Sequence, residues 1–221
     1  MISKGAFRRL THPLLLRLWL KSSQKVVNTT VGGFRMRIAP GVFHPKYFGS
    51  SAILGEYVES MDLKGKTFLD MGTGSGIVGL FASRAGAIVT AVDVNPEAVE
   101  CAQRNAAEAN QRVEYRVSDL FSGLPELRFD VIAWNPPFFP KRPSSAAEGA
   151  FYAGENHEVI ARFAREARTH LTNDGIILLV LSANVHVSGI TMMFKSEGFT
   201  VRNACTRKWM FGETMIVIKI R

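Results

Sequence analysis

Cysteine is scarce in this sequence. Its two cysteines, Cys101 and Cys205, lie in apolar, periodic stretches, which favours buried thiols in a reducing compartment, such as the cytoplasm, over a disulfide. The five histidines are scattered singly along the chain, and no spacing of Cys and His is typical of a metal site. We therefore expect a cytoplasmic protein that holds no metal ion.

Long hydrophobic runs are also missing. The apolar segment over residues 14–20 is split by Arg17, so it is too short and too charged for a transmembrane helix or the core of a signal peptide. Because Lys and Arg are interleaved with its Leu residues, it predicts a basic amphipathic helix that docks on the protein's own core, on RNA or on a membrane surface. We assign this helix and a strand over residues 34–40 to a basic N-terminal extension, residues 1–40, and the main domain to residues 41–221.

Acidic residues are outnumbered. The chain has 27 Lys and Arg against 19 Asp and Glu, which gives a net charge of +8. This surplus favours encounters with nucleic acid, ribosomes or anionic membranes without requiring any of them. With 221 residues, 47% of them hydrophobic, the chain is long enough for one packed core and short for two.

Helix-like and strand-like segments alternate along the main domain. The apolar spacing predicts helices over residues 50–61, 77–86, 96–110, 158–171 and 189–198, the first begun by a serine cap. It predicts seven strands over residues 67–71, 88–94, 113–120, 129–138, 175–181, 200–209 and 213–221. This alternation is typical of a doubly wound, mostly parallel α/β sheet. Since no helix separates the last two strands, they predict a closing antiparallel hairpin.

A glycine loop, DMGTGSG, lies between the first of these strands and the following helix. Gly72, Gly74 and Gly76 suit a backbone that turns sharply and lets a ligand approach more closely than a Cβ would allow. Asp93 ends the next predicted strand, 23 positions after Asp70, where a carboxylate can accept hydrogen bonds from both hydroxyls of a ribose. The pattern therefore favours a nucleotide-like ligand.

A third aspartate supports this interpretation. Asp119 lies at the end of the third predicted strand, where it could accept a hydrogen bond from an adenine amino group. A dinucleotide site usually spaces its glycines as GxGxxG, whereas this loop reads GxGxG after an acidic residue. A dehydrogenase is therefore the weaker alternative.

The segment WNPPFFP, residues 134–140, follows a predicted strand where most folds have a flexible turn. Its two consecutive prolines fix two φ angles, remove two backbone donors and push Asn135 out of the helical region. The turn is therefore stiff, which suggests that it holds something in place. Residues 138–149 after it predict a loop over an acceptor pocket.

Four segments, LDMGTGSG, VDVNPEAV, SDL and NPPF, together resemble successive motifs of the class I methyltransferases that use S-adenosylmethionine. The resemblance covers roughly residues 40–221. It implies a Rossmann-like sheet and S-adenosylmethionine as cofactor, with Asp70, Gly72 and Gly74 along the methionine moiety. By the same resemblance, Asp93 holds the ribose and Asp119 faces the adenine, and Gly76 and Asn135 belong to the same donor site.

In the N-methyltransferases that the chain resembles, NPPF marks enzymes that act on planar nitrogens, either side-chain amides or exocyclic amines of bases. The lone pair of such a nitrogen is delocalised, which makes it a poor nucleophile. The Asn135 side-chain oxygen and a backbone carbonyl fixed by Pro136 can accept its two hydrogens, so that the lone pair points at the sulfonium methyl. Phe138 is expected to pack against the flat amide or base. These three residues are the predicted catalytic residues.

Within this class the chain is most similar to the HemK-type glutamine methyltransferases, which modify translation release factors. PGVFHP, YAGENHEVIARFARE and FGETMIVIKI carry this similarity. The chain departs from many members in reading NPPF instead of NPPY, and the helical release-factor-binding domain of the bacterial type cannot fit into the first 40 residues. The shorter archaeal and eukaryotic type lacks that domain and works with a small activating partner, which makes such a partner an expectation here.

Other functions stay open. Methyltransferases of guanine in ribosomal RNA also carry PGVF and NPPF, and the basic charge suits them. A small-molecule acceptor needs no more than a compact domain of this size. A partner subunit that binds the cofactor without catalysis is the alternative outside the enzymes, and the intact glycine loop and Asn135 argue against it.

Overall fold

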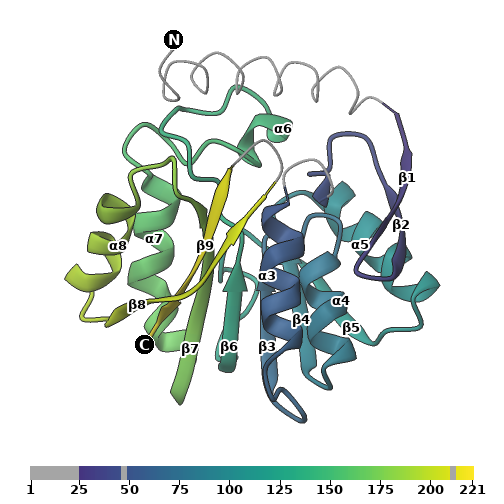
Figure 1. Cartoon of the computed structure of the whole chain (residues 1–221), viewed down its shortest axis with the longest axis horizontal. Helices are drawn as coiled ribbons and strands as arrows, with labels where there is room; N and C mark the ends of the chain where they lie inside the picture. Colours follow the sequence, from purple (N-terminus) through teal and green to yellow (C-terminus); the bar gives the residue numbers. More distant parts are fainter. Residues whose placement is uncertain (1–24, 46–48, 210–212) are drawn as a thin grey trace.

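The computed structural model describes residues 25–45, 49–209 and 213–221. The predicted amphipathic helix lies in residues 1–24 and therefore outside the described residues. At the centre of the described chain is a seven-stranded sheet with helices on both sides (Figure 1). Its strands, in spatial order, are β5 (Val113–Val117), β4 (Ile88–Asp93), β3 (Thr67–Met71), β6 (Phe129–Trp134), β7 (Leu171–Ser182), β9 (Thr214–Ile220) and β8 (Val201–Lys208).

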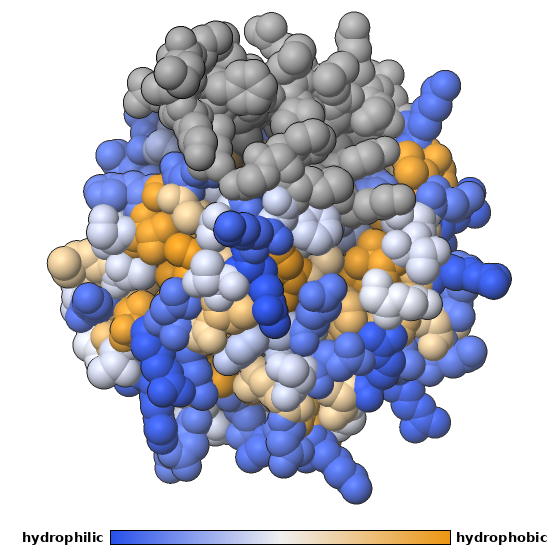
Figure 2. Space-filling view, viewed as in Figure 1, coloured by the Kyte–Doolittle hydropathy of each residue, from blue (hydrophilic) through white to orange (hydrophobic). Residues whose placement is uncertain are grey.

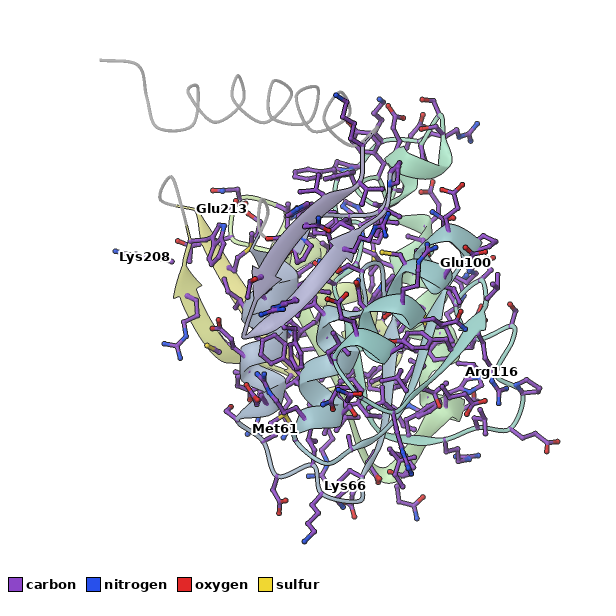
Figure 3. All side chains as sticks on the ribbon, turned by 90° about the vertical axis from the view of Figure 1, so that its right-hand side faces the viewer. Met61, Lys66, Glu100, Arg116, Lys208 and Glu213 are labelled. Atoms are coloured by element: carbon purple, nitrogen blue, oxygen red, sulfur yellow. The ribbon has the colours of Figure 1, made fainter. Side chains whose placement is uncertain are left out.

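The direction of the strands confirms the predicted fold class. Neighbouring strands from β5 to β7 are parallel, and β9 is antiparallel to both β7 and β8. In Figure 3, Lys208 at the end of β8 and Glu213 just before β9 flank the turn of this closing hairpin. Since β3, β4, β5 and β6 point the same way, the loops that follow them meet at one edge of the sheet.

Five helices of the described residues form the two outer layers: α3 (Ser50–Glu59), α4 (Ile77–Arg84), α5 (Pro96–Glu108), α7 (Glu158–Ala167), which continues into the 3-10 turn η1 (Arg168–His170), and α8 (Val187–Ser196). The short α6 (Ala146–Gly149) lies in the segment between β6 and α7. One apolar core lies between the sheet and α3, α4 and α5, and a second between the sheet and α7 and α8. Successive side chains of a strand belong to opposite cores, as Phe68 and Leu69 do, because strand side chains alternate between the faces.

A two-stranded hairpin precedes the domain, where the sequence predicted one strand. It consists of β1 (Val27–Val31) and β2 (Phe34–Ile38). The turn is Gly32–Gly33, and the φ angles of 56° and 86° explain the two glycines, because this tight hairpin turn needs positive φ at both positions. Two alternating runs separated by Gly-Gly were the signal for the missed strand.

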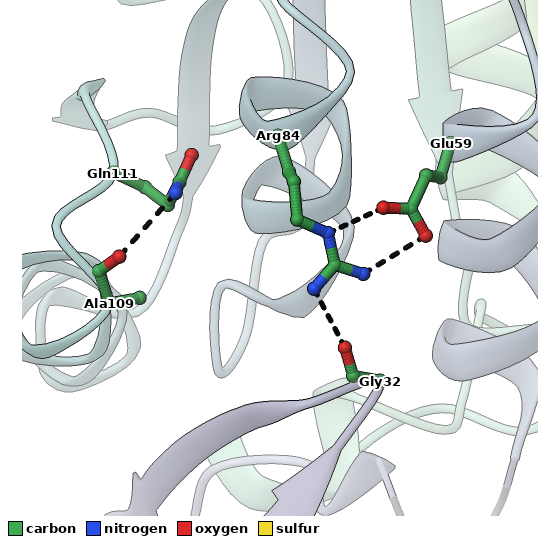
Figure 4. A network of polar contacts seen from close by, with 5 residues as sticks. All are labelled: Gly32, Glu59, Arg84, Ala109 and Gln111. Carbon is green, nitrogen blue, oxygen red and sulfur yellow. Dashed lines mark hydrogen bonds and ion pairs between the residues drawn. The ribbon is translucent and has the colours of Figure 1, made fainter.

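The hairpin packs into the same core as the main sheet. Val31, Phe34, Met36 and Ile38 are buried together with residues of α3 and α4. Arg84 of α4 lies over the ring of Phe34, donates to the Gly32 carbonyl at 2.8 Å and forms a bidentate ion pair with Glu59 (Figure 4). The figure also shows Gln111 donating to the carbonyl of Ala109 after α5.

The start of α3 corrects the predicted serine cap. The residue before the helix is Gly49 at a φ of 65°, and no side chain caps the helix. Ser50 and Ser51 lie inside the first turn and are buried. The predicted start of the helix at residue 96 is confirmed, since Pro96 is the first residue of α5. The structure adds the cap: the Asn95 side chain accepts from the Glu97 backbone N–H at 3.0 Å.

Both cysteines are free thiols. Cys101 is buried, as predicted, whereas Cys205 on β8 is only partly buried.

On the face in Figure 2, hydrophobic side chains form separate patches among hydrophilic ones. The most exposed large apolar residues include Val94 and Val117, and both lie at strand ends on the edge of the sheet where the loops meet.

Candidate active site

A cavity of about 190 Å³ opens at the carboxyl ends of β3, β4, β5 and β6. This is the switch point of the sheet, where the chain stops adding strands on one side of β3 and continues with β6 on the other. The residues that line it are Gly41, Val42, Phe43, Ser51, Met71, Gly72, Thr73, Gly74, Ser75, Asp93, Val94, Asn95, Ala98, Ser118, Asp119, Leu120, Trp134, Asn135, Pro137, Gly149, Ala150 and Val159. The structure thus brings five of the predicted site residues to one cavity.

The glycine loop forms one wall of this cavity. Gly72 and Gly74 line it, and a Cβ built on Gly74 meets no atom within 4 Å, so the backbone here is open to a ligand. Gly76 does not line the cavity. It is the residue just before α4, at a φ of 90°, and a Cβ there would lie 3.0 Å from the Cβ of Ala102, so Gly76 allows the end of the glycine loop to lie close to α5.

Asp70 lies beneath the loop and not at the cavity surface. It is buried, and its Oδ2 accepts hydrogen bonds from the Thr73 hydroxyl at 2.7 Å and the Gly79 backbone N–H at 2.9 Å. Burial raises the pKa of Asp70 to about 7, although these two hydrogen bonds act in the opposite direction. The carboxyl group therefore ties the loop to the first turn of α4.

Asp93 ends β4, as predicted, and lines the cavity. Its two carboxylate oxygens accept hydrogen bonds from the backbone N–H groups of Gly74 and Asn95, both at 2.9 Å. Each oxygen keeps a further lone pair for a ligand hydroxyl. Burial raises the pKa of Asp93, and the hydrogen bonds from Asn95 and Gly74 lower it.

Asp119 lines the cavity just beyond the end of β5. Its side chain is 53% exposed and forms an ion pair with Arg162 of α7, which the sequence did not predict. Arg162 also lies 3.9 Å from the carboxylate of Glu166. A ligand amino group bound at Asp119 would therefore share that carboxylate with a guanidinium group.

Asn135 lines the cavity directly after β6. Its Nδ2 donates to the hydroxyl oxygens of Ser50 at 3.0 Å and Ser51 at 2.9 Å. The two amide hydrogens are thus taken, and the side-chain oxygen is left as an acceptor. A serine hydroxyl can accept as well as donate, and here both hydroxyls accept from the amide, an arrangement that turns the Asn135 oxygen away from the two serines.

The rest of the NPPF turn is divided between the cavity and the protein interior. Pro137 lines the cavity, whereas Pro136 and Phe138 do not. The ring of Phe138 lies 4.8 Å from that of Phe139, and its carbonyl oxygen lies 3.2 Å from Nε2 of His157. A carbonyl can only accept, so His157 is the donor of this bond.

A family model matches most of the length of the chain. Residues 33–204 match the family model described as the methyltransferase small domain. The chain belongs to this family. Membership confirms the predicted class of enzyme, a methyltransferase, and the predicted cofactor, S-adenosylmethionine.

Individual proteins similar to this chain are also named methyltransferases. The methyltransferase is 30% identical over 193 residues to a protein of Methanocaldococcus jannaschii named "Putative protein N5-glutamine methyltransferase", a match that covers 85% of this chain and 95% of that one. It is 35% identical over 130 residues to the release factor glutamine methyltransferase of Koribacter versatilis, covering 53% of this chain and 46% of that protein. The chain thus spans less than half the length of this second relative.

A solved structure has the same fold. The E. cuniculi Mtq2–Trm112 complex, whose title gives methylation of the translation termination factor eRF1 as its role, superposes with a TM-score of 0.65 at 22% identity. The match covers 82% of this chain and 98% of that one. At this identity it shows the fold alone.

The cavity of the methyltransferase fits S-adenosylmethionine. Gly74 leaves room beside the backbone, Asp93 offers acceptors for hydroxyl groups, and the exposed Val94 offers apolar surface for a flat base.

Among the described residues, no group of three His, Cys, Asp or Glu side chains could hold a metal ion. A separate search of the same residues finds no helix with the length and apolar character needed to cross a membrane.

The segment after NPPF folds back over the cavity. Phe139 donates its N–H to the Phe151 carbonyl and accepts from the N–H of Ala153, both at 3.0 Å. The ring of Phe151 lies 5.4 Å from that of Phe43, which lines the cavity together with Ala150. The loop predicted over residues 138–149 therefore continues to α7 and supplies part of the cavity wall.

Sequence reasoning missed several residues of the site, among them Ser50, Ser51 and Trp134. Ser50 and Ser51 looked like a helix cap, and Trp134 looked like the end of a buried strand. Trp134 lines the cavity, and its ring lies 4.3 Å from that of Phe163, tilted by 32°. Two adjacent serines where one suffices for a cap, and an aromatic residue next to NPPF, were the available signals.

Proposed function

We propose that this methyltransferase transfers a methyl group from S-adenosylmethionine to a planar nitrogen, the side-chain amide of a glutamine in a protein of the translation machinery. The observation that carries the proposal is the arrangement at Asn135. Ser50 and Ser51 occupy its amide hydrogens, which leaves its oxygen to accept a hydrogen from an incoming NH₂ group. The glutamine specificity in the names of the M. jannaschii and K. versatilis proteins supports the finer assignment.

The donor site uses the residues on the glycine-loop side of the cavity. Asp93 accepts from the ribose hydroxyls, Val94 packs on the adenine, and Asp119 accepts from its amino group. The methionine moiety lies along the backbone of Gly72 and Gly74. Asp70 and Gly76 act indirectly, since Asp70 bonds to Thr73 and Gly79 beneath the loop and Gly76 packs against α5.

The bound donor supplies an electrophilic methyl group on a sulfonium. The Asn135 oxygen and a backbone carbonyl of the NPPF turn, held in place by its prolines, accept the two N–H hydrogens of the acceptor amide, which turns its lone pair out of the amide plane. The N–C bond forms as the S–C bond breaks, and one N–H proton then leaves to water. Because the departing sulfide is neutral, the site needs no strong base. Phe138 supports the turn from below and acts on the acceptor only through it.

Two further observations concern an alternative acceptor and a partner protein. The net charge of +8 favours a second candidate acceptor, an exocyclic base amine of ribosomal RNA. The partner in the E. cuniculi complex supports a small activating protein for this chain as well. Acceptors in the translation machinery would place the enzyme in the cytoplasm.

The test uses methyl-labelled S-adenosylmethionine and extract of the host cell. The enzyme is incubated with both, and label is measured separately in protein, RNA and small molecules. We expect label in protein, released as volatile methylamine when the labelled protein is hydrolysed, because hydrolysis of an N-methyl amide yields methylamine. The Asn135→Ala variant is the control for background labelling. Label in RNA, or label in protein that hydrolysis does not release as methylamine, would refute the glutamine assignment.

A further inference from the structure

Strand β2 pairs with β1 on one edge only. On its other edge, backbone groups bond to side chains of helix α5. Arg37 donates its backbone N–H to Oδ1 of Asn105 at 2.8 Å, and Cys101 donates its thiol to the Arg37 carbonyl at 3.2 Å. The backbone N–H of Ala39 lies 3.5 Å from the same thiol sulfur. Cys101 and Asn105 lie one turn apart on α5, the helix that carries Glu100 in Figure 3, where the hairpin crosses in front of it.

Asn105 also reaches the glycine loop. Its Nδ2 donates to the carbonyl of Ser75 at 2.9 Å, and Ser75 lines the donor side of the cavity. The side chain is fully buried, with 0% exposure. One amide thus joins strand β2, through its oxygen, to the loop, through its nitrogen. Only a side chain with both an acceptor and a donor can satisfy these two backbone groups.

The loop is held from three sides. Asp70 bonds to Thr73 and to Gly79, and Asp93 bonds to the N–H of Gly74. These contacts fix the beginning of the loop and its middle. The Ser75 carbonyl belongs to the peptide unit between Ser75 and Gly76, just before α4, and Asn105 is the described side chain that bonds to it. Without Asn105, this peptide would still be held at its N–H, which Gly76 donates to the Thr73 carbonyl at 2.8 Å, but the Ser75 carbonyl would lie buried without its partner.

We propose that Asn105 is a positioning residue of the donor site and that the β1–β2 hairpin is a structural part of that site. Asn105 holds the glycine loop in the conformation whose backbone receives S-adenosylmethionine, and Arg37 of the hairpin holds Asn105. The inference rests on the donor in the proposed function and is independent of the acceptor. Its test therefore needs no acceptor, so its failure can be told from a failure of the glutamine assignment.

The experiment compares Asn105→Ala and Asn105→Ser with Cys101→Ala in the full chain. The Cys101 variant loses contacts to Arg37 and Ala39 and the long contact of 3.7 Å between its sulfur and the Asn105 amide nitrogen, and it leaves the bond to Ser75 in place. Binding of S-adenosylhomocysteine, the stable product form of the donor, is measured by calorimetry, and folding by circular dichroism and the thermal midpoint. All three variants should have a lower midpoint because all loosen the hairpin.

Donor affinity should separate the variants. Loss of a buried hydrogen bond predicts a dissociation constant raised about tenfold or more for both Asn105 variants, and changed less than about twofold for Cys101→Ala. If Asn105→Ala does not fold, Asn105→Ser decides, because its hydroxyl is too short to bond both backbone groups. A folded Asn105 variant that binds like the wild type, or a Cys101→Ala affinity reduced as much as theirs, would overturn the proposal.

Discussion

Asn135 donates a hydrogen bond of 2.9 Å to the hydroxyl of Ser51, a residue 84 positions earlier in the chain. The bond joins the NPPF turn after β6 to the first turn of α3. It orients the amide that faces the cavity, and Ser50 repeats the contact at 3.0 Å. The chemistry assigned to Asn135 therefore depends on two serines in the first turn of α3.

Replacing both serines tests this dependence. In Ser50→Ala/Ser51→Ala the amide hydrogens lose both acceptors, and Asn135 can turn its NH₂ group toward the acceptor nitrogen. We expect turnover to fall at least tenfold, and by about 100-fold or more in Asn135→Ala, by analogy with loss of one preorganised hydrogen-bonding group at a reacting centre. Donor affinity should stay close to the wild type in both. Single-turnover transfer and calorimetric donor binding measure the two effects, and wild-type transfer by Asn135→Ala would exclude the planar-nitrogen mechanism.

Asp93→Ala should weaken donor binding while the protein stays folded. The variant loses the acceptor of the ribose hydroxyls and the bond to Gly74, which together should cost about 1 to 3 kcal/mol of binding free energy. Asp130→Ala is the matched control. It also loses a carboxylate that accepts from a backbone N–H, that of Thr67, but Asp130 does not line the cavity, so donor affinity should change little. Calorimetry that finds the same affinity for Asp93→Ala and the wild type would remove Asp93 from the donor site.

Local patterns in the sequence were sufficient for the sheet and its functional edge. The apolar run of β7, the Asn95–Pro96 start of α5 and the aspartate that ends β4 each depend on neighbours in the chain, so periodicity and capping rules predict them. A parallel sheet then brings successive strand ends together, which is why Asp93, Asp119 and Asn135 meet at one cavity.

Contacts between distant segments could not be predicted in this way. Ser50 meets Asn135 across 85 positions, and Asn105 meets Arg37 across 68. No local rule specifies such partners, because they depend on how α3 and α5 pack after the sheet has formed. The ion pair between Asp119 and Arg162 is a further contact of this kind, because it joins a residue just beyond β5 to helix α7, 43 positions later.

Two truncations test the role of the hairpin. Deletion of residues 1–24 leaves β1 and β2 intact, so donor affinity should remain that of the full chain. Deletion of residues 1–38 also removes Phe34 and the other buried hairpin residues, and the loss of one such aromatic alone costs about 3 to 5 kcal/mol. We expect the longer deletion to lower the thermal midpoint sharply and to abolish donor binding.

RNA binding by the same truncations tests the basic N-terminal segment. If residues 1–24 recruit RNA, their deletion should reduce both the affinity of the protein for RNA and the steepness with which added salt weakens it. Titration of labelled RNA at several salt concentrations measures both. Identical salt dependence with and without these residues would contradict recruitment through the N-terminal segment.

Asp70 should make the stability of the fold depend on pH. Its pKa is raised from 3.8 to about 7 in the folded protein, mainly by burial, so the folded state holds a proton that the unfolded state has already released. This group therefore contributes stability that is fully present below about pH 4 and is lost as the pH rises to about 7. A shift of this size corresponds to about 4 kcal/mol at most.

Urea unfolding of Asp70→Asn and Asp130→Asn at several pH values measures this contribution. Asp70→Asn cannot titrate, so its stability relative to the wild type should rise steadily between about pH 4 and pH 7. Asp130 is the matched control, because hydrogen bonds from Thr67 and Thr172 lower its pKa. Its contribution is present above its unfolded pKa and is lost only as the pH falls through the lower folded value, so the difference between Asp130→Asn and the wild type should stay constant over the same range. A difference for Asp70→Asn that is equally constant would mean that Asp70 is ionised throughout this range and that burial does not control its charge.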